Sequence, residues 1–157
     1  MIIIGYQGIG KSTLSKEQNG FIDLESGNFF VDGSRDEKWY IPYCNIAACL
    51  SGQGYHVFVS SHEVVRNQLS TSNQKVIIVC PSISLREKWI ERLQKRYDDT
   101  GLDKDKRALM FAADRYTDSI QELMADKRYE KVIIESMNYS LKHLLLGYYN
   151  CSGGENE

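Results

Sequence analysis

The sequence predicts a three-layer α/β domain, in which helices cover both faces of a five-stranded, mainly parallel sheet. Two observations lead to this prediction. Short apolar segments alternate with helical segments along the chain, and the first apolar segment, Ile2–Ile4, runs directly into a glycine-rich loop. With 157 residues, of which 42% are hydrophobic and 25% charged, the chain can bury one core. We therefore expect a single domain over residues 1–151 and a frayed tail at 152–157.

The glycine-rich loop, residues 5–12, reads GYQGIGKS and fits the pattern G-x-x-x-x-G-K-[ST], the phosphate-binding loop or Walker A motif. Its glycines let the backbone approach an anion, at which the loop N–H groups then point. Lys11 would carry its charge to the β- and γ-phosphates, and Ser12 would place its hydroxyl on Mg²⁺. A glycine-rich turn that binds nothing is the alternative, which the strand before the loop and the helix after it disfavour.

This motif predicts ATP and Mg²⁺ as cofactors, with Ser12 as the metal ligand. The residues expected to contact the nucleotide are Gly5, Gln7, Gly8, Ile9, Gly10, Lys11, Ser12 and Thr13.

Apolar runs and turn residues divide the rest of the chain into further strands and helices. The expected strands after the first are 21–25, 55–59, 75–80 and 131–135. The expected helices are 10–18, 41–51, 62–69, 84–97, 105–127 and 141–149. Segment 75–80 is continuously apolar, which suits the buried centre of a parallel sheet. The two long helices before the last strand form a lid-like segment at about 83–127.

Two carboxylates follow the second predicted strand, and ligands of open parallel sheets bind beyond the carboxyl ends of the strands. Asp23 and Glu25 are therefore candidates for binding the substrate. A carboxylate at this place orients Mg²⁺ through water, takes a proton from a hydroxyl acceptor, or bonds a sugar. The alternative is a solvated pair that caps the next segment. We favour the functional role for Asp23 and leave Glu25 open.

Three arginines are candidates for binding phosphate. Arg92 and Arg96 lie four residues apart, on one side of a predicted helix. Phosphoryl transfer needs cations around the moving group, for which arginine has the better shape. The alternative is a solvated basic face. Arg66, one turn into the helix after the third strand, is a candidate for holding an acceptor phosphate, with a surface arginine as the equal alternative.

The order of these parts resembles the small P-loop kinases: nucleoside monophosphate kinases, with shikimate and gluconate kinases nearby. The Walker A loop at the start of the chain and the segment 21–25, FIDLE, carry the resemblance. The helix pair with Arg92 and Arg96 looks like the arginine-bearing lid of these kinases. The resemblance implies the P-loop NTPase fold with strand order 2-3-1-4-5, and an acceptor site formed by residues 28–50 and Arg66.

The sequence departs from this family in two places. The third strand ends in Ser60-Ser61, where many P-loop proteins place an acidic Walker B residue, and the lid lacks a dense arginine cluster. Unless Asp23 or Glu25 supplies it, no acidic residue is evident for the surroundings of Mg²⁺.

The leading hypothesis is an ATP-dependent small-molecule kinase, a phosphotransferase whose acceptor is a nucleotide or nucleoside. The residues expected to act in catalysis are Lys11, Asp23, Arg92 and Arg96. The alternative is a regulatory or switch protein that binds nucleotide and turns it over slowly. The missing Walker B acid slightly favours this alternative, and the absence of an N-K-x-D motif opposes it.

Composition narrows the partners and the compartment. The net charge of −2 gives no bulk attraction to nucleic acid, which disfavours a nucleic-acid-end kinase. The sequence has neither a signal-peptide pattern nor an apolar run of membrane-spanning length, so we expect a cytoplasmic protein with a small-molecule phosphoryl acceptor and no membrane partner. The four cysteines show no zinc or redox spacing. The oligomeric state stays open.

Overall fold

The computed structural model describes residues 1–152, with side chains up to residue 150, and has a single five-stranded sheet. All neighbouring strands are parallel, in the order β2-β3-β1-β4-β5. The strands are β1 (Ile2–Gly5), β2 (Phe21–Asp23), β3 (His56–Val59), β4 (Val76–Pro81) and β5 (Glu130–Ile134). The predicted α/β class and the strand order of a P-loop NTPase-like fold are confirmed.

The centre of the sheet is its most apolar part. Every residue of β1 and of β4 is buried, and Ile2 pairs with Val57 of β3 on one side and Val76 of β4 on the other. Such continuous apolar strands need cover on both faces. The loop after β1 therefore starts from the buried centre of the sheet.

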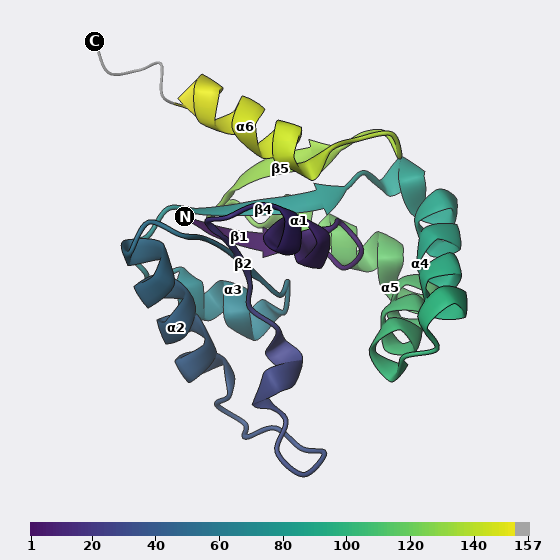
Figure 1. The fold of residues 1–157 in the computed structure, drawn as a ribbon, viewed down its shortest axis with the longest axis horizontal. Coiled ribbons are helices and arrows are strands. Elements are labelled where there is room, and N and C mark those ends of the chain that lie inside the picture. Colours follow the sequence, from purple (N-terminus) through teal and green to yellow (C-terminus); the bar gives the residue numbers. More distant parts are fainter. Residues whose placement is uncertain (153–157) are drawn as a thin grey trace.

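In the described residues, six α-helices surround the sheet. They are α1 (Lys11–Glu17), α2 (Tyr40–Gly52), α3 (Glu63–Leu69), α4 (Arg86–Thr100), α5 (Asp103–Ala125) and α6 (Leu141–Ser152). From β1 to β2 the chain moves toward one edge of the sheet, and each later connection moves toward the other edge. Because such crossovers are right-handed, α1 lies on one face of the sheet and α2, α3 and α5 lie on the other. Figure 1 shows α6 on one side of the sheet and α2 and α3 on the opposite side.

The helix pair α4–α5 lies beyond the carboxyl end of β4 (Figure 1). Trp89 and Leu93 of α4 and Tyr116 of α5 are buried. Gly101 ends α4 with a φ of 64°, and its N–H donates to the carbonyl of Tyr97. The helix thus continues through the aspartates at 98 and 99, where the sequence predicted a break.

Other predicted boundaries also shift by a few residues. A 3₁₀ turn at Ile83–Leu85 delays the start of α4, and α6 continues to Ser152 rather than ending at residue 149. The predicted tail at 152–157 lies, beyond its first residue, outside the described residues. Within residues 1–152, the structure contains no helix whose length and apolar character would let it cross a bilayer.

Candidate functional site

The phosphate-binding loop joins β1 to α1 and has the backbone that its glycines permit. Gly8 has a φ of 82°, and Gly10, which caps the start of α1, has a φ of 102°. Gly5 lacks room for a side chain, because a Cβ there would lie 2.8 Å from Ile9 Cδ1 and 2.8 Å from the Lys11 Cδ. Two of the three glycines are thus required by conformation and one by packing.

Three successive carbonyls of this loop accept hydrogen bonds from side chains outside it. Trp89 Nε1 donates to the carbonyl of Gln7 over 2.9 Å, and Tyr139 Oη donates to the carbonyl of Ile9 over 2.8 Å. Between them, Arg92 Nη1 lies 3.5 Å from the carbonyl of Gly8. Carbonyl oxygens repel a phosphate, so donors that hold them favour the loop conformation whose N–H groups serve the anion.

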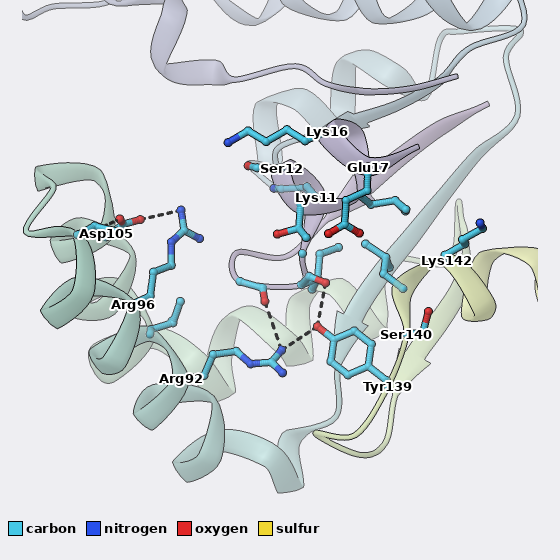
Figure 2. A pocket seen from close by; sticks show the side chains of 18 of the residues that line it. Lys11, Ser12, Lys16, Glu17, Arg92, Arg96, Asp105, Tyr139, Ser140 and Lys142 are labelled. Atoms are coloured by element: carbon cyan, nitrogen blue, oxygen red, sulfur yellow. Dashed lines mark hydrogen bonds and ion pairs between the residues drawn. The ribbon is translucent and has the colours of Figure 1, made fainter. Parts of the chain in front are cut away.

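Arg92 belongs to this support of the loop. Its Nη1 also donates to Tyr139 Oη over 2.8 Å (Figure 2). Its guanidinium lies 4.9 Å from the ring centroid of Trp89 and 5.2 Å from that of Tyr139. We expected Arg92 at a transferring phosphate, and the structure gives its guanidinium contacts to the loop carbonyl and to these two rings. No local pattern in the sequence indicated Tyr139, which lies 130 residues from its loop partner Ile9.

At the end of the loop, Lys11 and Ser12 face the carboxyl end of β2. Lys11 Nζ donates to the carbonyl of Gly5 over 3.0 Å, and Ser12 Oγ donates to Asp23 Oδ2 over 2.5 Å. Burial lowers the pKa of Lys11, and the nearby carboxylates of Asp23 and Glu25 oppose that shift. Asp23 therefore brings a carboxylate to the loop from β2. The residues directly after β3, Ser60 and Ser61, bring none.

Two cavities meet at this loop. The first, of about 940 Å³, lies between α1, α4 and the start of α6, with Lys16, Glu17, Tyr139 and Lys142 on its wall (Figure 2). The second, of about 620 Å³, lies between the loop, the segment after β2 and α5. Six residues border both cavities: Gly8, Lys11, Ser12, Arg96, Lys104 and Asp105.

Arg96 stands at the junction of the two cavities. Its Nη2 forms an ion pair with Asp105 Oδ1 of α5 over 2.7 Å, and Thr100 Oγ1 donates to the other carboxylate oxygen over 2.6 Å (Figure 2). Asp105 is 2% exposed, whereas the side chain of Arg96 is 42% exposed. Arg96 is thus anchored by a buried carboxylate and still reaches both cavities.

Two further predicted residues, Arg66 and Glu25, border the second cavity, and they differ in burial and in their partners. Arg66 is buried and bonded to three partners: Asp126 at 2.9 Å, Glu122 at 3.4 Å and the carbonyl of Ser61 at 3.2 Å. Glu25 lies 4.0 Å from Lys104 of α5. The guanidinium of Arg66 is therefore committed to its protein partners, and Glu25 keeps its carboxylate at the cavity edge.

His62, which follows the third predicted strand, also lines the second cavity. From the sequence it is a candidate to polarise a substrate or, as the favoured alternative, to cap the next helix; it does precede α3, but its side chain makes no capping hydrogen bond. His62 shares a hydrogen bond of 2.8 Å with Ser60 Oγ and packs edge-on against Trp39. Burial and the positive charges of Arg35 and Lys11 lower the pKa of His62, which favours the neutral ring at neutral pH. Nothing in the local sequence pattern indicated this packing, because segment 26–39 contains only short turns.

Two side-chain oxygen atoms, Ser12 Oγ and Asp23 Oδ2, lie together at the end of the loop. Within the described part of the chain, the side chains of His, Cys, Asp and Glu form no group of three or more that would hold a metal ion. Ser12 and Asp23 match the oxygen ligands that Mg²⁺ prefers, and Mg²⁺ usually completes its coordination with water and substrate phosphate.

Comparisons with known proteins add a short match. No family model matches the chain. Over 31 residues the chain is 55% identical to the energy-coupling factor transporter ATP-binding protein EcfA1 of Latilactobacillus sakei subsp. sakei (strain 23K). The match covers 20% of this chain and 11% of that protein, so the chain is similar to about a tenth of the length of this relative. The fold, the loop and this match agree at the level of a P-loop NTPase-like protein.

Proposed function

We propose that this protein is an ATP-dependent kinase that transfers the γ-phosphoryl group of ATP to a small-molecule acceptor, a nucleotide or nucleoside. The observation that carries the proposal is the meeting of two cavities at the Walker A loop, with Lys11, Ser12 and Arg96 bordering both. Hydrolysis of ATP requires one substrate pocket beside the loop. Transfer between two substrates requires two pockets that open onto the same phosphate.

The first cavity is proposed to bind ATP. It begins at the loop and extends along α1 to Lys142 of α6, a space that accommodates a nucleoside while its phosphates lie on the loop. Lys11 and Arg96 supply the positive charge around the γ-phosphoryl group. The name of the matched transporter subunit describes that protein as ATP-binding, which is in keeping with this choice of nucleotide.

The residues beside the loop suit Mg²⁺. The Ser12 hydroxyl proton points to Asp23, so a lone pair of Ser12 Oγ is available to a metal ion. When bound, Mg²⁺ would neutralise negative charge on the phosphate oxygens. Asp23 thereby takes the place of the acidic residue that is missing after β3.

In the transfer step an oxygen of the acceptor forms a bond to the γ-phosphorus, and the bond from that phosphorus to the β–γ bridging oxygen breaks. ADP leaves with the electron pair of the broken bond. An acceptor phosphate needs no base, whereas an acceptor hydroxyl passes its proton to a carboxylate, for which Asp23 and Glu25 border the second cavity. The negative charge that develops on the phosphate oxygens during transfer is stabilised by Lys11, Arg96 and the loop N–H groups.

The test is transfer of label from γ-³²P ATP in the presence of Mg²⁺ and a panel of nucleotides, nucleosides and small hydroxy acids. The wild type is compared with Lys11→Ala, and Lys88→Ala serves as a control for the loss of an exposed lysine of α4. A labelled product made by the wild type and the control, but not by Lys11→Ala, supports the kinase. Tight binding of ATP without transfer to any acceptor contradicts it.

The second candidate is a regulatory nucleotide-binding protein with little turnover. One observation favours it: β3 ends in Ser60 and Ser61, so the strand next to the loop brings no carboxylate to the phosphates. The same assay separates the two candidates, since a regulatory protein binds ATP with no gain in turnover when an acceptor is added.

A further inference from the structure

The second cavity contains an arginine, Arg35, that forms no ion pair with a carboxylate in the part of the chain that the structure describes. Arg35 follows the 3₁₀ turn Ser26–Phe29, and its guanidinium carbon lies 4.4 Å from the ring centroid of Phe30 and 4.1 Å from that of Trp39. Within residues 1–152, its Nη1 is shielded from solvent and has no hydrogen-bond partner. A shielded, unpaired guanidinium nitrogen is unfavourable, so it marks a place where an acceptor is missing.

A second arginine reaches the same cavity from α5. Arg107 is exposed, borders the second cavity, and has no ion pair within the described residues. Both arginines border the same cavity, and, after burial, the positive charge of Arg107 helps to lower the pKa of Arg35. Two arginines that border one cavity, and that have no ion pair within the described residues, can serve as a site for an oxyanion.

The other arginines of this cavity differ from this pair. Arg66 binds Asp126 and Glu122, Arg96 binds Asp105, and Arg115 lies 3.6 Å from Asp118. Their charges are balanced within the protein. Among the arginines that border this cavity, Arg35 and Arg107 are therefore the two without an ion pair within the described residues.

Two aromatic rings border the cavity near these arginines. Phe30 is 45% exposed and Phe111 of α5 is 48% exposed, although phenylalanine is normally buried. Exposed rings beside a cavity provide flat apolar surfaces on which an aromatic base stacks. The ring of Phe30 also lies 4.4 Å from the guanidinium carbon of Arg35, and both side chains border the cavity.

We propose that Arg35 and Arg107 bind the phosphate of a nucleoside monophosphate, whose base packs against Phe30 and Phe111, and that this nucleotide is the phosphoryl acceptor. The proposal deepens the kinase proposal and rests on it. A nucleoside would leave the two arginines without an anion, and a small hydroxy acid would leave the two rings without an aromatic partner. The nucleotide is the class that uses both features.

This placement also agrees with the transfer step. Arg35, Lys11 and His62 all border the second cavity, so the anion site and the loop lysine open onto the same space. An oxygen of the acceptor phosphate would attack the γ-phosphorus, the bond to the β–γ bridging oxygen would break, and the products would be ADP and a nucleoside diphosphate. No proton has to move when the acceptor phosphate is a dianion.

The test measures binding before it measures transfer. Isothermal titration calorimetry without ATP compares nucleoside monophosphates, the matching nucleosides, and the hydroxy acids shikimate and gluconate. The variants are Arg35→Gln and Arg107→Gln, with Arg86→Gln as the control, because Arg86 of α4 borders neither cavity. Binding of ATP to each variant confirms that the loop and the fold are intact.

We expect at least one monophosphate to bind more tightly than its nucleoside, and each of the two variants to weaken that binding by about tenfold or more. The Arg86→Gln variant should bind the monophosphate as tightly as the wild type does. The affinity for ATP should be unchanged in all three variants. Equal affinity for nucleoside and monophosphate, preference for a hydroxy acid, or unaltered binding in both variants overturns the proposal. Arginine-dependent binding without transfer of label supports this site and contradicts the kinase proposal, so the two failures are distinguishable.

Discussion

The hydroxyl of Ser12 donates to the carboxylate of Asp23 over 2.5 Å, which joins the start of α1 to the end of β2. The two residues are 11 positions apart and come from elements that meet at the carboxyl edge of the sheet. This contact brings an acidic group to the phosphate-binding loop from a strand at the edge of the sheet, although β3, between β2 and β1, brings none.

Asp23→Asn tests this contact. The amide keeps the shape of the side chain and loses its charge, so the Ser12 proton is no longer drawn toward residue 23. We expect about a 10- to 100-fold higher Mg²⁺ requirement for phosphoryl transfer, measured as the rate at increasing Mg²⁺. Asp114→Asn, an exposed aspartate of α5, is the control. A Mg²⁺ dependence identical to that of the wild type would show that Asp23 does not serve the metal.

Tyr139→Phe tests the support of the loop. The substitution removes the donor to the Ile9 carbonyl and the acceptor for Arg92, while the ring can still stack on Trp89. We expect affinity for ATP to fall about fivefold or more, as for the loss of one buried hydrogen bond. Titration calorimetry measures the affinity.

Tyr149→Phe is the matched control for this loop variant, since its hydroxyl pairs with His56 Nδ1 over 2.8 Å, away from the loop. If the two variants bind ATP equally well, the hydrogen bond of Tyr139 does not shape the phosphate site.

Gly8→Ala and Gly20→Ala form a second matched pair. Both glycines have positive φ, 82° and 89°, so both substitutions carry a backbone cost of about 1–2 kcal/mol. A Cβ at Gly8 would also lie 3.0 Å from Leu93 Cδ2 and 3.1 Å from Trp89 Nε1, while nothing lies within 4 Å of one at Gly20. We therefore expect Gly8→Ala to lower the free energy of unfolding more than Gly20→Ala does.

Urea denaturation measures the difference between these two glycine variants. Equal destabilisation would mean that α4 moves away from the loop without cost and that the loop is not tightly packed against it.

Asp126→Asn tests the buried cluster behind the second cavity. Hydrogen bonds from Arg128 and from Arg66 hold the pKa of Asp126 well below its usual range. The unfolded chain therefore binds the proton more readily, so the carboxylate stabilises the fold at neutral pH. That contribution is lost as the pH falls below about 4, the usual aspartate value, toward the lower pKa of the folded state.

We expect Asp126→Asn to cost about 3 kcal/mol at pH 7, since it leaves the buried Arg66 without its closest partner. The difference from the wild type should shrink on acidification. Asp118→Asn, which breaks an exposed pair with Arg115, should cost about 0.5 kcal/mol or less. Thermal denaturation between pH 3 and pH 7 checks both values, and a pH-independent difference would contradict this assignment.

Local signals in the sequence were sufficient for the fold. Apolar runs such as residues 75–80 and the helical spacing of Leu85, Trp89 and Leu93 indicate each element through contacts within a few residues. Helix ends were less well predicted, because several neighbouring residues could each begin or end a helix. In the structure the turn at Ile83–Leu85 precedes α4, and Gly101 rather than the preceding aspartates ends it.

The sequence by itself determined the strand–loop–helix context of the phosphate-binding loop and the placing of Asp23 after a strand, since both depend on neighbours in the chain. Only the tertiary structure decided what Arg92, Arg66 and Arg35 contact. Arg92 meets Tyr139 and Arg66 meets Asp126, 47 and 60 residues away. A charged side chain binds whichever partner the packed elements bring within about 3 Å, and spacing along the chain carries no record of that distance.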